Sequence, residues 1–311
     1  MKYSALLHIV RYSAYTTVSV DDPWHDGRTL HKYVLVDRSK PVPPTLPEGS
    51  VIRIPTQRDV VFNTAHCQLM DWLGASNEIC GVADLKYILV PSVLKGVESG
   101  VISDCGEVMG ELGASGAVKG VCDAQYFNDE MISKGLADGT IIDCGNSMQP
   151  TIEKVIQMNP DAILLSPYQK ADYGKIKDLK IPIIECADYM EHSALARAEW
   201  MRFYGILFGK ESEADSLFAV VDSSYHSLRQ IALRSPSKRS IITEKLTGST
   251  WYVPGGASSI GGIISDANGQ YAWSSDSHSG SLAMTFETVL DKAGNSDVWI
   301  FNHLGSGPLN Y

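Results

Sequence analysis

The stretch that decides the fold runs from residue 191 to residue 235 and reads EHSALARAEWMRFYGILFGKESEADSLFAVVDSSYHSLRQIALRS. It contains almost only good helix formers, with Gly205 and Gly209 as its weak points. Apolar residues recur along it at helical spacing: Leu195, Trp200, Phe203, Leu207, Leu217, Val220, Val221, Leu228 and Ile231. The stretch therefore predicts a long helical segment.

Short apolar strands alternate with helices on both sides of this segment. Before it, strands are predicted at residues 60–62, 79–82, 141–142, 162–165 and 181–184, and helices at 64–73 and 151–158. After it, strands are predicted at residues 240–243, 251–253 and 298–301, and helices at 260–267 and 285–293. Continuously apolar strands that alternate with helices are typical of a parallel sheet covered on both faces. The predicted fold class is therefore α/β, with two Rossmann-like lobes joined by a long rigid helix.

The first 50 residues predict a β extension that precedes the lobes. Residues 15–20 and 32–36 are rich in β-branched and aromatic residues, and residues 21–27 between them are typical of a turn. A Pro-rich joint, residues 41–47, follows. We therefore predict four parts, listed in chain order: a β extension at 1–50, an N-terminal α/β lobe at 51–190, an interlobe helix at 191–235 and a C-terminal α/β lobe at 236–311.

The composition excludes several classes of protein. The chain has 311 residues, of which 44% are hydrophobic and 20% are charged, as in ordinary soluble globular proteins. Its formal net charge of −10 repels phosphate backbones, so a nucleic-acid partner is not expected. No apolar run approaches the ~18–20 residues that a membrane span needs, and the first 20 residues do not have the pattern of a signal peptide.

The six cysteines do not predict a metal site or a cofactor. They lie far apart, at Cys67, Cys80, Cys105, Cys122, Cys144 and Cys186, and form no Cys-x-x-Cys pair. A closed zinc site needs closely spaced pairs of ligands. Most of these cysteines are therefore expected to be small buried residues.

An internal repeat lies inside the predicted N-terminal lobe. Residues 70–109 align without gaps with residues 109–148 and share 17 identical positions. Two copies are too few for a solenoid, which needs at least three. We therefore interpret the repeat as a local tandem duplication of one strand–loop–helix–strand unit.

The motifs for enzymatic chemistry are weak. Asp276, Ser277 and His278 are adjacent, but a catalytic triad needs convergence in space, and the sequence has no Gly-x-Ser-x-Gly motif. The Gly-rich stretch at residues 255–262 lacks the Gly-Lys-Ser/Thr ending of a phosphate-binding loop. Two interpretations of this stretch stay open: its glycines only make the turn, or its backbone amides meet a ligand at a helix N-terminus.

Two similar helices, one in each half of the chain, carry a glutamate in the first turn. Thr151 precedes Glu153 in the first helix, and Thr285 precedes Glu287 in the second. Each glutamate favours its own helix N-terminus by roughly 0.3–1 kcal/mol. A further interpretation is that the two halves are pseudo-equivalent and present matching carboxylates to a partner.

These segments resemble the ABC-importer substrate-binding proteins for iron complexes and cobalamin. The resemblance rests on an ordered set of motifs: PTIEKV at 150–155, PDAILL at 160–165, IPIIE at 181–185, RAEW at 197–200 and FGK at 208–210. It implies two α/β lobes joined by one rigid helix, with a ligand held between them. It also implies that Glu153 and Glu287 dock onto arginines of the membrane permease, since arginine pairs well with carboxylates.

The resemblance further implies a periplasmic or other extracytoplasmic protein, made with a signal peptide or as a lipoprotein. We expect a monomer. The chain departs from the family pattern in three ways: it carries the repeat, it shows no leader, and it stops at Tyr311, where relatives usually continue. The C-terminal lobe is therefore expected to be incomplete.

Ligand contacts are expected from the loops at the C-terminal ends of the strands. The candidates are His66, Asp123, Tyr126, Tyr168, Tyr189, Trp251, Tyr252, His278 and His303. These loops are rich in aromatic residues and poor in Arg and Lys, which favours a macrocycle such as cobalamin over an anionic ferric siderophore, while haem stays open. His66, His278 or His303 is either an axial ligand of the metal or an ordinary structural or surface histidine.

Two other hypotheses remain beside a metal-chelate binding protein. An enzyme on a similar two-lobed frame, such as a metallocluster or chelatase-like protein, would need convergent Cys or His ligands, and the scattered cysteines argue against it. A degenerate family member, altered by the duplication, would act only as an interaction module. The predicted protein is therefore a binding protein and not an enzyme.

Overall fold

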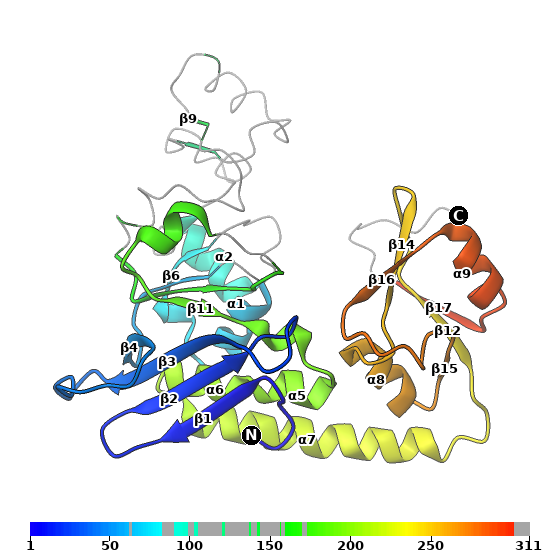
Figure 1. The fold of residues 1–311 in the computed structure, drawn as a ribbon, viewed down its shortest axis with the longest axis horizontal. Helices are drawn as coiled ribbons and strands as arrows, with labels where there is room; N and C mark the ends of the chain where they lie inside the picture. The colour runs from blue at the N-terminus through cyan, green and yellow to red at the C-terminus, as the bar shows by residue number, and fades with distance from the viewer. Residues whose placement is uncertain are drawn as a thin grey trace. The chain divides into compact units, whose positions relative to one another are not determined.

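The structure is a computed structural model that describes residues 1–61, 64–82, 90–98, 103–104, 120–121, 137, 142–143, 156, 159–169 and 173–301. The chain divides into two compact units, drawn in Figure 1. The N-terminal unit consists of His8–Ala187 and Met201–Asp215. The C-terminal unit consists of Met1–Leu7, Asp188–Trp200 and Ser216–Tyr311. The boundaries of the four predicted parts stay predictions.

The first sheet of the N-terminal unit is formed by the β-rich start of the chain. Its four strands are β1 (Leu7–Arg11), β2 (Thr16–Asp21), β3 (Thr29–Asp37) and β4 (Ser50–Ile54), and they lie in this order. β2 and β3 are antiparallel, whereas β3 and β4 are parallel. Val18 and Val20 are buried while Ser19 is half-buried, which is the alternation expected of a sheet with one covered face.

The second sheet of the N-terminal unit is parallel throughout, as the apolar strands predict. Its strands are β5 (Asp59–Val61), β6 (Ile79–Val82), β7 (Ser103–Asp104), β10 (Ala162–Leu165) and β11 (Ile183–Glu185), in the order β11-β10-β5-β6-β7. The helices α1 (Thr64–Trp72) and α2 (Pro91–Glu98) follow β5 and β6, and two short 3₁₀ helices lie at η1 (Ser76–Glu78) and η5 (Gly174–Asp178). Every residue of β5 and β10 is buried. The strands β8 (Gly120–Val121) and β9 (Ile142–Asp143) form a separate parallel pair.

The helical segment between the two halves consists of three consecutive helices. They are α5 (Ala194–Glu199), α6 (Met201–Leu207) and α7 (Glu211–Leu233). Gly209 has φ 66°, a left-handed conformation that ends α6 and that favours glycine. Gly205 lies inside α6. Glycine is needed there because a Cβ would come within 2.6 Å of the Ala214 Cβ. The long helix of this segment is therefore α7, with 23 residues.

The C-terminal unit contains one parallel and one antiparallel sheet. The strands β12 (Ser240–Thr243), β15 (Gln270–Tyr271) and β17 (Val298–Ile300) pair in parallel in the order β15-β12-β17. The strands β13 (Leu246–Thr247), β14 (Thr250–Pro254) and β16 (Ser281–Met284) form the antiparallel sheet. The helices are α8 (Ser259–Asp266) and α9 (Phe286–Ala293), and the 3₁₀ helix η6 (Ala187–Met190) starts where the two units meet in sequence. A parallel sheet in each unit confirms the α/β class.

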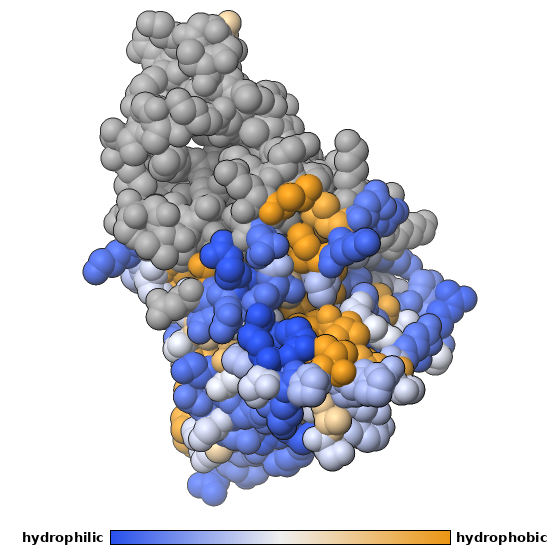
Figure 2. Space-filling model, turned by 90° about the vertical axis from the view of Figure 1, so that its left-hand side faces the viewer, coloured by the Kyte–Doolittle hydropathy of each residue, from blue (hydrophilic) through white to orange (hydrophobic). Residues whose placement is uncertain are grey.

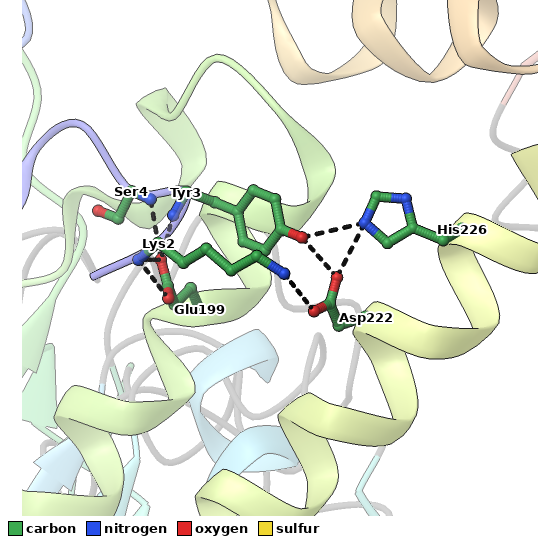
Figure 3. A network of polar contacts seen from close by, with 6 residues as sticks. All are labelled: Lys2, Tyr3, Ser4, Glu199, Asp222 and His226. Carbon is green, nitrogen blue, oxygen red and sulfur yellow. Dashed lines mark hydrogen bonds and ion pairs between the residues drawn. The ribbon is translucent and has the colours of Figure 1, made fainter.

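The N-terminal segment of the chain is held by a buried carboxylate in the helical segment. Glu199 is fully buried and accepts the backbone N–H groups of Lys2, Tyr3 and Ser4 at 2.8, 2.8 and 2.9 Å (Figure 3). The side chains of Lys2 and Tyr3 donate to Asp222 of α7 at 2.9 and 2.7 Å. We call residues 2–6 the N-terminal strap.

A second buried carboxylate holds the rest of this strap. Glu191 accepts the backbone N–H groups of Ala5 and Leu6 at 3.1 and 3.3 Å, and the Ser4 hydroxyl also donates to it. The indole N–H of Trp200 donates to the same carboxylate at 2.8 Å. Hydrogen bonds of this kind offset the cost of burying a charge.

Two loops of the C-terminal unit pack backbone against backbone. We call residues 255–261 together with residues 273–280 the glycine clasp. The Gly255 N–H donates to the Gly280 carbonyl at 2.8 Å, and the Tyr271 hydroxyl donates to the Pro254 carbonyl at 2.7 Å. A Cβ on Gly256 would lie within 2.5–2.6 Å of three backbone carbonyl oxygens of residues 273–276. Close packing thus accounts for glycine at this position.

The surface of the described residues is mixed. The face shown in Figure 2 carries hydrophilic side chains with separate hydrophobic patches between them. No helix among the described residues has the length and apolar character that crossing a membrane requires.

A buried acid lies at the start of the central strand β5. Asp59 is fully buried, and its neighbours across the sheet are Ala162 of β10 and Ile79 of β6. Burial raises the pKa of Asp59 to about 8, since the charged form loses its hydration. Thr56 opposes this shift by hydrogen bonding.

This carboxyl predicts a loss of stability with rising pH. Between about pH 4 and pH 8 the folded chain keeps a proton on Asp59 that the unfolded chain has lost, so the free energy of unfolding falls as the pH rises through this range. Asp59→Asn should remove this contribution and be more stable than the parent at pH 8. Urea unfolding of both proteins at pH 5, 7 and 9 measures the difference, and a constant difference at all three values would contradict the prediction.

Two glycine substitutions in the glycine clasp should differ in their effect on stability. Gly256→Ala should destabilise the C-terminal unit by about 1–3 kcal/mol, because its Cβ would meet backbone that has no room to move. Gly280→Ala is the matched control in the same clasp, since a Cβ there meets nothing within 4 Å. Thermal unfolding compares the two variants. Equal melting temperatures would show that the close approach at Gly256 does not matter.

Candidate functional site

In the N-terminal unit, the ligand-facing edge is expected where the parallel strands end. β5, β10 and β11 are neighbours in one sheet, so the segments that follow them lie at the same edge. After β10, Pro167 is buried and the Tyr168 side chain is exposed. Tyr168 thus offers an aromatic face at this edge.

The last residue of β11 joins this edge to the first sheet. The carboxylate of Glu185 is 2.9 Å from Nδ1 of His31 and accepts the Tyr173 hydroxyl at 2.7 Å. The backbone N–H of Glu185 donates to the Tyr33 hydroxyl at 2.8 Å, and the rings of His31 and Tyr33 stack at 4.5 Å. Burial raises the pKa of Tyr33 well above its usual value. Each of these groups is engaged within the protein, so the cluster holds the two sheets together.

His66 lies in α1, directly after β5, but faces the protein interior. Its side chain is buried, and its ring centroid lies 5.8 Å from that of Tyr204 in α6. The sequence predicts His66 in a helix at 64–73, directly after a strand, and counts it among the ligand-binding candidates. The structure has this helix but packs His66 against an aromatic core, so a ligand would have to reach a buried imidazole.

In the C-terminal unit, three polar side chains lie around the glycine clasp. Nδ1 of His192 is 3.4 Å from the Ala257 carbonyl oxygen. Asp276 accepts the backbone N–H of His278 at 2.9 Å and lies 2.9 Å from its Nδ1. These contacts hold the pKa of Asp276 below its usual value. Because the His278 side chain is largely exposed, this arrangement presents its Nε2 to solvent.

The two aromatic candidates on β14 point to opposite faces of their sheet. Trp251 is buried in the core of the C-terminal unit, and its indole N–H donates to the Thr243 carbonyl at 2.9 Å. Tyr252 is half exposed. The strand alternation thus separates a packing residue from a surface residue.

Two further candidates lie at helix starts. Tyr189 lies in η6 and is half-buried, and this burial raises the pKa of its hydroxyl. Glu287 is exposed in the first turn of α9, whose N-cap Thr285 accepts the Thr288 N–H at 3.3 Å. Its carboxylate is therefore open to a partner.

The remaining predicted site residues lie outside the described residues. They are Asp123, Tyr126, His303 and Glu153. Their roles stay predictions.

The described residues contain no group of three or more His, Cys, Asp or Glu side chains placed to hold a metal ion. Cys67 and Cys186 are buried free thiols, and burial raises the pKa of Cys67 to about 12. A thiol of such high pKa is a poor nucleophile and metal ligand.

Three residues near these edges were not singled out from the sequence: His31, His192 and the carboxylate of Glu185. Glu185 ends the IPIIE motif that carries the resemblance, a signal for the motif but not for the contacts of this carboxylate. His31 and His192 gave no such signal, because their partners are distant in sequence or are backbone carbonyls.

Several solved structures have the same fold as this chain. An ABC-type Fe3+-hydroxamate transport system protein from Saccharomonospora viridis has a TM-score of 0.55 at 16% identity and covers 82% of this chain and 76% of its own. A periplasmic binding protein from Veillonella parvula has a TM-score of 0.52 at 12% identity, covering 94% and 74%. A siderophore-binding protein of Vibrio cholerae bound to Fe3+–Desferal has a TM-score of 0.50 at 14% identity, covering 80% and 79%. At these identities the likeness shows the fold.

A sequence relative comes from an archaeon. An uncharacterized lipoprotein of Methanocaldococcus jannaschii is 27% identical over 290 residues, which cover 88% of this chain and 59% of the relative. The chain thus spans about three fifths of the length of this relative.

A family model described as periplasmic binding protein matches residues 108–306, which is more than half of the chain. Members of this family bind solutes and are not enzymes, and the two parallel sheets agree with their fold. The chain belongs to the periplasmic binding protein family.

Proposed function

We propose that the chain is the extracytoplasmic substrate-binding component of an ABC importer and delivers a metal chelate to a membrane permease. The family match over residues 108–306 carries this proposal. Two solved structures with the same fold are an iron-hydroxamate transport protein and a siderophore-binding protein, and the archaeal relative is a lipoprotein, which supports an extracytoplasmic location.

Two exposed aromatic side chains suit an organic chelate with an extended face. Tyr168 in the N-terminal unit and Tyr252 in the C-terminal unit are each about half exposed, and aromatic faces stack on planar rings. We therefore favour a macrocycle, cobalamin or haem, over a ferric siderophore.

His278 is the best-placed candidate for the axial ligand of the bound metal. Its Nδ1 lies against the Asp276 carboxylate, which leaves Nε2 as the nitrogen that faces solvent. A carboxylate on one ring nitrogen orients an imidazole and raises its basicity toward a metal at the other. His66 is buried and His303 lies outside the described residues, so neither has this support.

Glu287 and Glu153 are proposed to dock the protein onto the permease. Glu287 is exposed in the first turn of α9, where its carboxylate can meet a guanidinium of a partner. A rim carboxylate of this kind sets the specificity and rate of docking rather than ligand affinity.

The ligand proposal predicts stabilisation by one chelate class. Cobalamin or haem, added at about 100 times its dissociation constant, should stabilise the protein by about 2.7 kcal/mol. Tyr168→Ala should weaken binding about tenfold, because losing an aromatic contact costs about 1–2 kcal/mol. Trp72→Ala is the control: Trp72 is also exposed, but it lies at the far end of α1 from the ligand-facing edge.

Thermal shift and titration calorimetry with cobalamin, haem and a ferric hydroxamate measure these effects. Stabilisation by the hydroxamate alone would replace the macrocycle with a siderophore. If none of the three binds, the protein is a degenerate member acting as an interaction module. In the bound macrocycle, His278→Ala should shift the absorption bands of the metal centre, and an unchanged spectrum would exclude His278 as the axial ligand.

The docking proposal predicts a separation of binding from uptake. Glu287→Ala with Glu153→Ala should abolish ligand uptake by cells that carry the cognate permease, while the purified variant binds ligand as the parent does. Asp291→Ala is the matched control, since Asp291 is exposed on the same helix α9. Normal uptake by the double variant would refute the docking role.

A further inference from the structure

The sequence repeat forms the same pair of strands twice. We call residues 70–109 copy 1 and residues 109–148 copy 2. β6 and β7 of copy 1 pair in parallel, and so do β8 and β9 of copy 2. The registers correspond position by position along the repeat: Gly81 with Ser103 and Val82 with Asp104 in copy 1, Gly120 with Ile142 and Val121 with Asp143 in copy 2. Both copies thus contain a parallel pair of strands in the same register.

The five-stranded sheet holds only one of these two pairs. β6 of copy 1 pairs with β5, with Val61 opposite Val82, whereas β8 and β9 form a sheet of two strands. An isolated pair of strands is marginally stable at best. One strand can therefore pair with β5 on this side of the sheet. The chain has two candidates for this position: β6 of copy 1 and β8 of copy 2.

The residues that fill this place in copy 1 recur in copy 2. Leu73, Ala75 and Val82 are at most 1% exposed, and their counterparts are identical: Leu112, Ala114 and Val121. Ile79, also 1% exposed, has the conservative counterpart Val118. These core positions are thus encoded in both copies, whereas Cys80 of β6 has Lys119 as its counterpart.

Two substitutions favour copy 1 in the sheet: Lys119 in place of Cys80 of β6, and a carboxylate in place of a buried valine. Val90, immediately before α2, is 1% exposed, and its counterpart in copy 2 is Asp129. Seating copy 2 would bring a carboxylate to a position that is buried in copy 1, which is costly. Either arrangement leaves one copy of the same length outside the sheet, so the cost of closing that loop is the same in both.

The family match points to copy 2. The matching region begins at residue 108, so it includes copy 2 and continues from it, while copy 1 lies before it. The family match thus covers copy 2, whereas copy 1 occupies the five-stranded sheet.

We propose that the two copies are alternative occupants of the place next to β5, with copy 1 preferred because of Cys80 and Val90, and that copy 2 replaces copy 1 when copy 1 is damaged. This exchange does not depend on the binding role. If the binding role holds, the exchange also changes which segment follows the strand paired with β5. With copy 1 in the sheet this segment is ADLKY at residues 83–87, and with copy 2 it is CDAQY at residues 122–126. Each segment contains an Asp and a Tyr at matching positions, and three other residues differ.

Three full-length variants test the exchange by thermal unfolding. Val121→Asp should leave the melting temperature unchanged, because Val121 is outside the five-stranded sheet. Val82→Asp should lower it by only a few degrees, because copy 2 takes the place. The double variant should lose its cooperative transition, because neither copy then has an apolar residue for this core position. A Val82→Asp variant as damaged as the double variant would overturn the proposal.

Two further variants test the same proposal independently. Adding Asp129→Val to Val82→Asp should raise the melting temperature toward that of the parent, because it removes the carboxylate that copy 2 would bury. A chain lacking residues 70–108 should still unfold cooperatively, with copy 2 in the sheet. No recovery in the first variant, or loss of cooperative unfolding in the second, would count against exchange.

Discussion

Two buried carboxylates in the helical segment fix the start of the chain. Glu191 and Glu199 are fully buried, and ionised groups in such positions are tolerated only when they are well hydrogen bonded. Backbone N–H groups of residues 2–6 supply much of that bonding. The strap and the helices around residues 191–200 therefore depend on each other. Without the strap the two carboxylates lose hydrogen-bond donors, and without the carboxylates the backbone N–H groups of the strap lose their acceptors. Two glutamates within a stretch of helix formers give no sign of this, because their donors lie almost 200 residues away.

The sequence predicted elements well where local chemistry decides them. The strands at 79–82, 162–165 and 240–243 and the cap at Thr285 are where the pattern placed them. Helical periodicity predicted burial for Leu195, Trp200, Phe203 and Leu207 but not for the later positions on α7. Leu228 and Ile231 repeat at helical spacing, yet each is 65% exposed on α7. The spacing of apolar residues indicates that a segment is helical, whereas the burial of each residue depends on what packs against the helix.

The candidate site was predictable only as a set of strand ends. Which side chain of a neighbouring pair faces out depends on register, so Trp251 and Tyr252 had equal claims until the strand assigned one to the core. Asp59 is a further residue whose burial could not be predicted from the sequence. An aspartate before two valines is typical of a turn leading into a strand, but here it is the first residue of a central strand and keeps its proton near neutral pH.

The family model matches copy 2, whereas copy 1 builds the five-stranded sheet. Both copies pair their two strands in the same register, so register alone does not choose between them. The choice rests on two positions, where cysteine and valine of copy 1 are replaced by lysine and aspartate in copy 2. Net stability is a small difference between large terms, so two such positions are enough to set a preference without making the alternative inaccessible. A duplicated unit can therefore preserve a fold while leaving its loops free to diverge.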